Sequence, residues 1–476
     1  MLFNMVIERY YNKMKSTNKI KQFVKTALTY LTGNVLSKLV AFFLLPLYTS
    51  KLLPAEYGTY DLVISLVNLV APIAFFQIWD GMFRFAFDYK QDKDKYSIIS
   101  NSCIAYLFGI IIYITIFFAI NLYYKFDYFG LIICYGFLFA LQYMYTYAAR
   151  VFLKNKLFSI SGIINTFISA CLNIILITKF NSGVESLYIS SSCGCLIQII
   201  IIELNLKIIK NFKLKSININ LIKKMLKFSL PLCVATISYW LLSGFTKVII
   251  TQKLGADENG IYAVANRFAS TVTIVVNVFQ YAWNEMAYLM SSDNKRKEKY
   301  NLCLDIILKC TLISSGIIFL GVKIIFPYFI DIKYAAATKI VPIIILGVSF
   351  NSLAGFIGTF FMTEKQTKYI LQSTMIGAIV NIILSFILIK KLKLLGATIA
   401  LSISFLILLL SRLLLLKKQL KISISPSAIY PTTIIIFSSI VYYYNKNTII
   451  DILTIIISLL TLAIMIIKKI KKNITI

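Results

Sequence analysis

The chain contains the stretch KLLPAEYGTY at residues 51–60 and a related stretch, KLGADENGIY, at residues 253–262. We call them the first and second motif. Aligned without a gap, they share Lys, Leu, Glu, Gly and Tyr at the same places, and each separates two apolar runs of helical length. Ordered matches at a nearly constant offset indicate an internal duplication. Two further matches follow downstream: Phe76-Gln77 with Phe279-Gln280, and Lys95-Tyr96 with Lys299-Tyr300.

The composition is that of a membrane protein. Hydrophobic residues make up 59% of the chain, charged residues only 14%, and the mean hydropathy is +0.81. Apolar runs of roughly 20 residues, long enough to cross the hydrocarbon core, recur from end to end. We therefore predict an all-α polytopic membrane protein with about 14 transmembrane helices. The net charge of +30 does not indicate nucleic-acid binding, because the lysines lie in short loops between the spans.

A lysine-rich segment divides the chain into two lobes. We predict a first lobe of six spans at residues 1–206, a cytoplasmic basic linker at 207–227, a second lobe of six spans at 228–421, and two additional helices at 422–476. Because six is an even number, the lobes should be related by a pseudo-twofold axis along the membrane normal. Most of the 49 Lys and Arg residues fall in alternate loops, which predicts a multi-pass protein with both termini in the cytoplasm.

Three of the basic residues within predicted spans lie where an unpaired charge is expensive. They are Lys38 in the first span, Lys247 in the seventh and Arg267 in the eighth. We predict that they line a water-filled passage between the lobes and hold an anionic headgroup. For Lys247, snorkelling to the outer interface is an equal alternative. Arg84, at the cytoplasmic end of the second span, could receive a phosphate or serve as an ordinary positive-inside anchor.

Polar residues follow one face of the eighth predicted span at steps of three and four. In lipid such a face must meet protein or water. It therefore either lines the passage or joins helices through hydrogen bonds. The stripe consists of Asn259, Tyr262, Asn266, Ser270, Thr273, Asn277, Gln280 and Asn284.

Asp61 and Asp80 are the carboxylates that could couple transport to an ion. Coupling to H+ or Na+ stays open, and we expect no other cofactor and no metal site. The chain lacks a phosphate-binding loop of the type Gly-x-x-x-x-Gly-Lys-Ser/Thr, and no acidic pair in an outer loop suggests glycosyl transfer. We therefore predict that the chain is not an enzyme.

Residues 45–49, 53–60 and 80–85 resemble the bacterial polysaccharide flippases of the O-antigen flippase (Wzx-type) family, within the multidrug/oligosaccharidyl-lipid/polysaccharide exporter superfamily. The resemblance implies two six-helix lobes that move undecaprenyl-diphosphate-linked oligosaccharide from the inner to the outer leaflet of the bacterial cytoplasmic membrane. It places an arginine where Arg84 stands and implies a cationic cavity, which Lys38, Lys247 and Arg267 match loosely in position.

The resemblance also bears on partners and alternatives. It implies membrane lipids and the lipid-linked oligosaccharide as partners, the polysaccharide polymerase machinery as a candidate partner, and no nucleic acid; we expect a monomer. A lipid II flippase and a multidrug/cation antiporter of the same superfamily remain alternatives. A membrane polysaccharide polymerase fits less well, because such an enzyme normally needs a large outer loop and the predicted outer loops are short.

Overall fold

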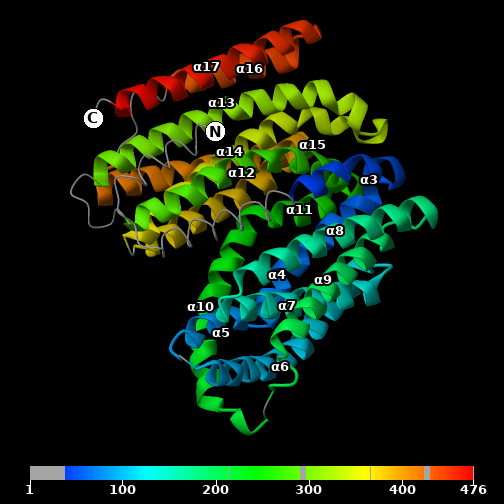
Figure 1. The fold of residues 1–476 in the computed structure, drawn as a ribbon. Helices are drawn as coiled ribbons and strands as arrows, with labels where there is room; N and C mark the ends of the chain where they lie inside the picture. The colour runs from blue at the N-terminus through cyan, green and yellow to red at the C-terminus, as the bar shows by residue number, and fades with distance from the viewer. Residues whose placement is uncertain are drawn as a thin grey trace.

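The computed structural model describes residues 38–89, 91–212, 214–289, 296–364, 366–422 and 429–474, with the backbone alone described at a few of these positions. Most of the predicted first span, 27–50, therefore lies outside the described residues. The described part is built of helices without a strand, which confirms the all-α prediction (Figure 1).

The helices follow one another with short connections. In chain order they are α3 (Leu45–Lys51), α4 (Pro54–Ala74), α5 (Ile78–Ala86), α6 (Asp92–Tyr124), α7 (Phe129–Val151), α8 (Asn155–Lys179), α9 (Glu185–Leu206), η1 (Leu214–Ser216), α10 (Ile219–Ser243), α11 (Phe245–Leu254), α12 (Ala256–Leu289), α13 (Arg296–Phe329), η2 (Ile332–Lys339), α14 (Val341–Thr363), α15 (Lys368–Leu420), α16 (Ile429–Tyr444) and α17 (Thr448–Ile474).

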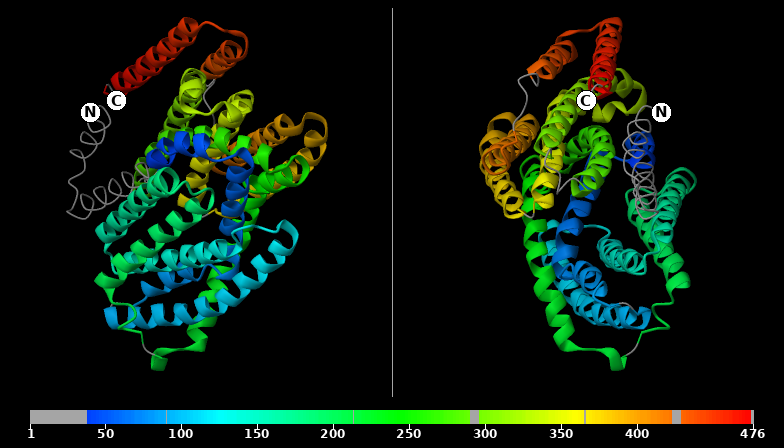
Figure 2. Two further views of the ribbon diagram at one scale, coloured as in Figure 1. Left: turned by 90° about the vertical axis from the view of Figure 1, so that its right-hand side faces the viewer. Right: turned by 60° about the vertical axis from the view of Figure 1, so that its left-hand side comes forward.

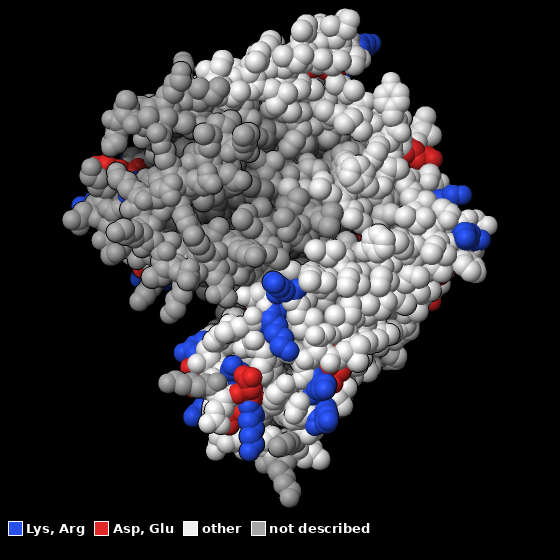
Figure 3. All heavy atoms as spheres, in the orientation of Figure 1, with Lys and Arg blue, Asp and Glu red and all other residues white. Residues whose placement is uncertain are grey.

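Ten of the described helices are long and apolar enough to cross a membrane. They expose large apolar side chains, such as Phe108 and Leu122 on α6, and most of the described surface in Figure 3 bears no charge. An apolar outer surface of this extent fits hydrocarbon, so the chain is a multi-pass membrane protein. The total of about 14 spans, which was estimated from hydropathy, stays a prediction.

Local backbone geometry breaks one predicted span and divides one long helix. The second span ends as a helix at Ala74, after Pro72, which cannot donate a helical hydrogen bond. Phe76 and Gln77 then adopt positive φ angles before α5 begins. The long helix α15 is kinked where Lys393 has a φ of 49°, which separates it into the two predicted spans 370–389 and 395–416.

The buried apolar side chains form two cores. The first runs from Leu62 to Met225, through α4 to α10. The second contains the buried residues from Leu242 to Tyr442, and also Leu45, Tyr48, Leu52 and Tyr57 from the start of the chain. In Figure 1, the blue and green helices of the first core lie below the yellow and orange helices of the second. The first motif thus reaches into the opposite half, while the boundaries 206, 227 and 421 stay predictions.

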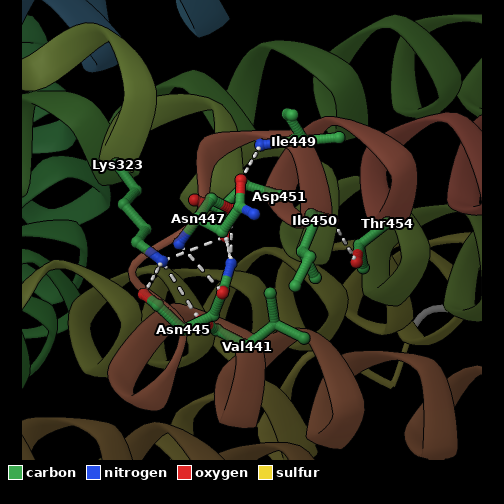
Figure 4. Close-up of polar contacts among 8 residues, drawn as sticks. All are labelled: Lys323, Val441, Asn445, Asn447, Ile449, Ile450, Asp451 and Thr454. Atoms are coloured by element: carbon green, nitrogen blue, oxygen red, sulfur yellow. Dashed lines mark hydrogen bonds and ion pairs between the residues drawn. The ribbon is translucent and has the colours of Figure 1, made fainter.

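The hairpin of α16 and α17 packs on the outside of α13, at the edge of the molecule (Figure 2). Lys323 of α13 holds it through three contacts drawn in Figure 4. Its Nζ donates to the carbonyl oxygens of Val441 (3.1 Å) and Asn445 (2.8 Å) and pairs with Asp451 at 3.0 Å. The carbonyl of Asn445 lies just past the end of α16, so the lysine satisfies a group beyond the helical hydrogen bonds.

Candidate functional site

The two motifs touch each other. A Cβ atom on Gly58 would lie 2.0 Å from the carbonyl oxygen of Ala256, and one on Gly260 would lie 2.0 Å from that of Pro54. Asn259 adds a hydrogen bond of 2.7 Å from its Nδ2 to the carbonyl oxygen of Gly58. Only glycine permits backbones to approach this closely. The contact is reciprocal, as a twofold relation between the copies would make it.

Helix η2 covers the same end of the molecule, which we call the motif end. The Nζ of Lys333 donates to the carbonyl oxygen of Ser50 at 3.1 Å, and the hydroxyl of Tyr334 donates to that of Leu52 at 3.1 Å. The fully buried Tyr334 ring also meets Tyr57 edge-on, with ring centroids 6.5 Å apart. The two halves are therefore joined at the motif end.

An ion pair between the halves lies deeper. The Nζ of Lys247 on α11 is 2.8 Å from Oδ1 of Asp61 on α4, and their side chains are 15% and 21% exposed. Counted along α4 from Pro54, Asp61 lies about 10 Å from the helix start, as does Lys247 from the end of α11. Each charge is thus satisfied by the other at a depth where an unpaired charge would be costly.

Arg267 joins this pair from α12. Its guanidinium lies within electrostatic range of Tyr57, Tyr60 and Asp61, and part of its surface remains accessible. We call Asp61, Lys247, Arg267 and Tyr57 the inter-lobe cluster. The sequence predicted Lys247 and Arg267 in one site but assigned Asp61 a separate role, whereas the structure brings all three together.

The other predicted residues of this site lie further along α12. The Nζ of Lys38 donates to Oγ1 of Thr273 at 2.9 Å, about 9 Å beyond Arg267 along the helix. Asn266, Asn277 and Gln280 are half-buried on α12, and the side chain of Asn284 lies outside the described residues. The polar stripe therefore extends from the inter-lobe cluster toward the position of Lys38.

Asp80 and Arg84 stand apart from the inter-lobe cluster. Asp80 lies within electrostatic range of Tyr147, Trp79 and Arg150, and the guanidinium of Arg150 stacks over the Tyr147 ring at 5.2 Å. Arg84 pairs with Asp88 at 2.9 Å, and both side chains are more than half exposed. The geometry of Arg84 is that of a surface residue at the end of α5.

The structure gives two further basic residues defined contacts. Arg412, counted among the loop residues by hydropathy, is buried in α15 and donates to Ala354, Ser373 and Thr374. Its place inside a run of leucines was a signal of burial. Arg150 stacks on three aromatic rings. Among the described residues, no group of His, Cys, Asp and Glu side chains could hold a metal ion.

The fold is shared with solved membrane transporters. The lipid II flippase MurJ in an inward closed conformation superposes with a TM-score of 0.68 at 16% identity, over 94% of this chain and 99% of that one. An inward-facing multidrug resistance MATE transporter of the MOP superfamily gives 0.63 at 13% identity, over 85% and 95%. A MOP superfamily transporter from Pyrococcus furiosus gives 0.57 at 14% identity, over 84% and 95%.

Sequence comparison gives the family. No curated protein sequence matches the chain. The family model described as "Polysaccharide biosynthesis protein" matches residues 23–283, which is more than half of the chain. The structural neighbours are described as a flippase and transporters, in agreement with the prediction that the chain is not an enzyme. The chain therefore belongs to the polysaccharide biosynthesis protein family and has the fold of the MOP-superfamily transporters.

Proposed function

We propose that the chain is a flippase for undecaprenyl-diphosphate-linked oligosaccharide repeat units. It moves them from the cytoplasmic to the outer leaflet of the bacterial cytoplasmic membrane, for the assembly of O-antigen, capsule or exopolysaccharide. The observation that carries the proposal is the inter-lobe cluster, where Lys247 pairs with Asp61 between the two halves and Arg267 lies within electrostatic range of the same carboxylate. The family description supports the polysaccharide pathway.

The charge of the site suits a diphosphate. With Lys38 included, three cations on α11, α12 and the first span stand against one carboxylate. A diphosphate carries a charge that hydrocarbon excludes, so a basic, hydrated path lowers the barrier to crossing. Arginine is well suited to this ligand, because its planar guanidinium binds phosphate oxygens in pairs. The polyprenyl tail can stay in the lipid while the headgroup passes.

The contacts at the motif end support transport by alternating access. We place this end outside, with both termini in the cytoplasm, so that the structure represents a state closed to the outside. The lobes would rock about the inter-lobe cluster, and substrate would select between the inward- and outward-open states. In this movement Asp61 would act as the ion-pair partner of Lys247. Coupling to H+ or Na+ through Asp61 or Asp80 is to be tested separately.

The direct test is reconstitution. Cells that lack the protein accumulate the lipid-linked repeat unit, which is extracted and placed in liposomes together with purified protein. An impermeant enzyme then measures the glycan that reaches the other leaflet. We expect wild-type protein to accelerate the transfer. Arg267→Gln and Lys247→Gln should slow it at least about tenfold, because each removes a charge from a site of low dielectric. Lys179→Gln, at an exposed helix end, is the matched control.

The same liposome assay, together with cells that lack the protein, distinguishes the alternative functions. Transfer of lipid II in place of the repeat unit would identify a lipid II flippase. Transport of a cationic dye that is lost in Asp61→Asn or Asp80→Asn would identify an antiporter. In cells, loss of a flippase leaves single lipid-linked units on the cytoplasmic side, whereas loss of a polymerase leads to their export. Absence of any transfer by protein with a wild-type melting curve would reject the proposal.

A further inference from the structure

Aromatic side chains occupy every fourth position along one face of α7. They are Tyr135, Phe139, Tyr143 and Tyr147, and the centroids of successive rings are 5.8, 4.9 and 6.4 Å apart. Trp79 of α5 packs against Tyr143 at 5.3 Å. Phe83, four residues further on α5, meets Tyr147 at 5.6 Å. We call these six residues the aromatic row.

The aromatic row faces the interior of the bundle. Cys134, on the outer half of α7, is exposed, and Tyr143 follows it by nine residues, which on a helix is a rotation of about 900° and so the opposite face. Tyr143 nevertheless exposes 38% of its surface. The carboxylate of Asp80 lies within electrostatic range of both Tyr143 and Tyr147, and a carboxylate is costly to hold against hydrocarbon. The exposed face of Tyr143 therefore lies near Asp80 and away from the face of α7 that carries Cys134.

The row begins beside the inter-lobe cluster. Tyr60 of α4 lies within electrostatic range of both Arg267 and Tyr135. From Tyr135 the row runs about 18 Å along α7 to Tyr147, by the rise of a helix. It ends at Arg150, whose guanidinium stacks over Phe83 at 4.7 Å. A ligand whose phosphates sit at Arg267 could thus lay an extended headgroup along the rings.

The chemistry of the row differs from that of the inter-lobe cluster. Asp80 and Arg150 lie close enough to offset each other, so the row attracts no net charge. Tyr143, its exposed member, and the partly buried Phe83, Phe139 and Tyr147 offer ring faces and phenol hydroxyls that both donate and accept, beside one carboxylate that accepts. Trp79 and Tyr135 are buried and support these rings from behind. Sugar rings present C–H groups on their faces and hydroxyls around their edges, which matches both kinds of group. Pockets of this kind, aromatic with a few placed polar groups, fix the orientation of small ligands.

We propose that the aromatic row binds the glycan of the transported molecule, with Tyr143 as its central contact, while the inter-lobe cluster binds the diphosphate. This inference rests on the proposed function and assigns a second subsite to it. Tyr147 and Asp80 would hold sugar hydroxyls at the end of the row. The row would then discriminate among glycans, whereas Arg267 would bind any polyprenyl diphosphate.

Calorimetric titration of purified protein in detergent with two probes tests the proposal. One probe is undecaprenyl diphosphate, and the other is the same lipid bearing the repeat unit, extracted from cells that lack the protein. We expect Tyr143→Leu to raise the Kd for the glycosylated lipid about five- to tenfold, the effect of losing one aromatic contact, and to leave the Kd for the bare lipid unchanged. Arg267→Gln should raise both, and Tyr143→Phe should bind as wild type.

Phe167→Leu, on the exposed face of α8, is the matched control, because it removes an aromatic ring that lies outside the aromatic row. If Tyr143→Leu binds the glycosylated lipid as tightly as wild type, or weakens both probes equally, the row serves packing and the inference is wrong. If wild-type protein binds neither probe, the proposed function itself is wrong. Melting temperatures of all variants show that each comparison is made on folded protein.

Discussion

Replacement of Gly58 by alanine is the sharpest test of the contact between the motifs. The new Cβ would lie 2.0 Å from the carbonyl oxygen of Ala256 and 2.6 Å from the amide nitrogen of Gly260. Both are backbone atoms, so no side-chain rotation can relieve the overlap. An ordinary contact needs about 3.5 Å, so the motif ends of α4 and α12 must separate by roughly 1–1.5 Å.

The cost falls on the closed state alone. Overpacking of a tight contact destabilises by about 1–3 kcal/mol, which changes the ratio of two conformations by about 5- to 150-fold. Gly260→Ala makes the reciprocal overlap, with Pro54. The destabilisation of the closed state in the double variant should be smaller than the sum of the two single effects. The first substitution already separates the helices that the second would push apart.

Spin labels at Lys51 and Lys253 report the change. Both residues are exposed, and they are the first residues of the two motifs. In a cysteine-free background, double electron–electron resonance spectroscopy should show a longer distance between the two labels in Gly58→Ala and Gly260→Ala than in the parent protein. Gly355→Ala is the control, because a Cβ on Gly355 would meet nothing within 4 Å. An unchanged distance in both motif variants, with wild-type transport, would refute the closed contact.

Three further perturbations follow from the described contacts. Asp61→Asn leaves Lys247 without its counter-charge; a double-mutant cycle with Lys247→Gln, read by thermal unfolding, should give a coupling of about 1–2 kcal/mol, since the pair is only partly exposed. Arg412→Lys should lower stability by about 1–3 kcal/mol in the same assay, because one ammonium cannot replace a guanidinium that bonds to separate helices. Lys323→Met should raise amide hydrogen exchange in α16 and α17 but not in α4, because Asp451 and the end of α16 lose their partner.

Hydropathy and repetition predicted much of the fold. The runs of apolar residues gave the helices, and the kink at Lys393 falls beside the Lys390-Lys391 pair that separated two predicted spans. The break at Phe76 and Gln77 was not predicted. Pro72 alone does not specify it, since many membrane helices accommodate proline by bending, and the positive φ angles depend on packing around the residues.

The sequence predicted how deep the charged residues of the candidate site lie, but not which of them form an ion pair. Asp61 follows the first motif directly and Lys247 lies just before the second, so both could be placed at similar depth from the sequence. Their partnership depends on which faces of α4 and α11 meet, and a single sequence does not give the rotation of one helix relative to another. The same holds for Gly58 and Gly260: the duplication identified both glycines, but only packing shows that each lies against the other motif.

The Asp61–Lys247 ion pair links the binding of substrate to the opening of the motif end in the proposed transport cycle. In the closed state, Asp61 is the anion beside Lys247 and Arg267, and it joins α4 to α11 across the halves. An arriving diphosphate would offer the same two cations stronger acceptors, and would so weaken the hold of Asp61 on the opposite half. A ligand shifts a conformational equilibrium only by its difference in affinity for the two states. Exchange of a carboxylate for a diphosphate at this crossing would supply such a difference, because the diphosphate would compete with a contact that joins α4 to α11 in the closed structure.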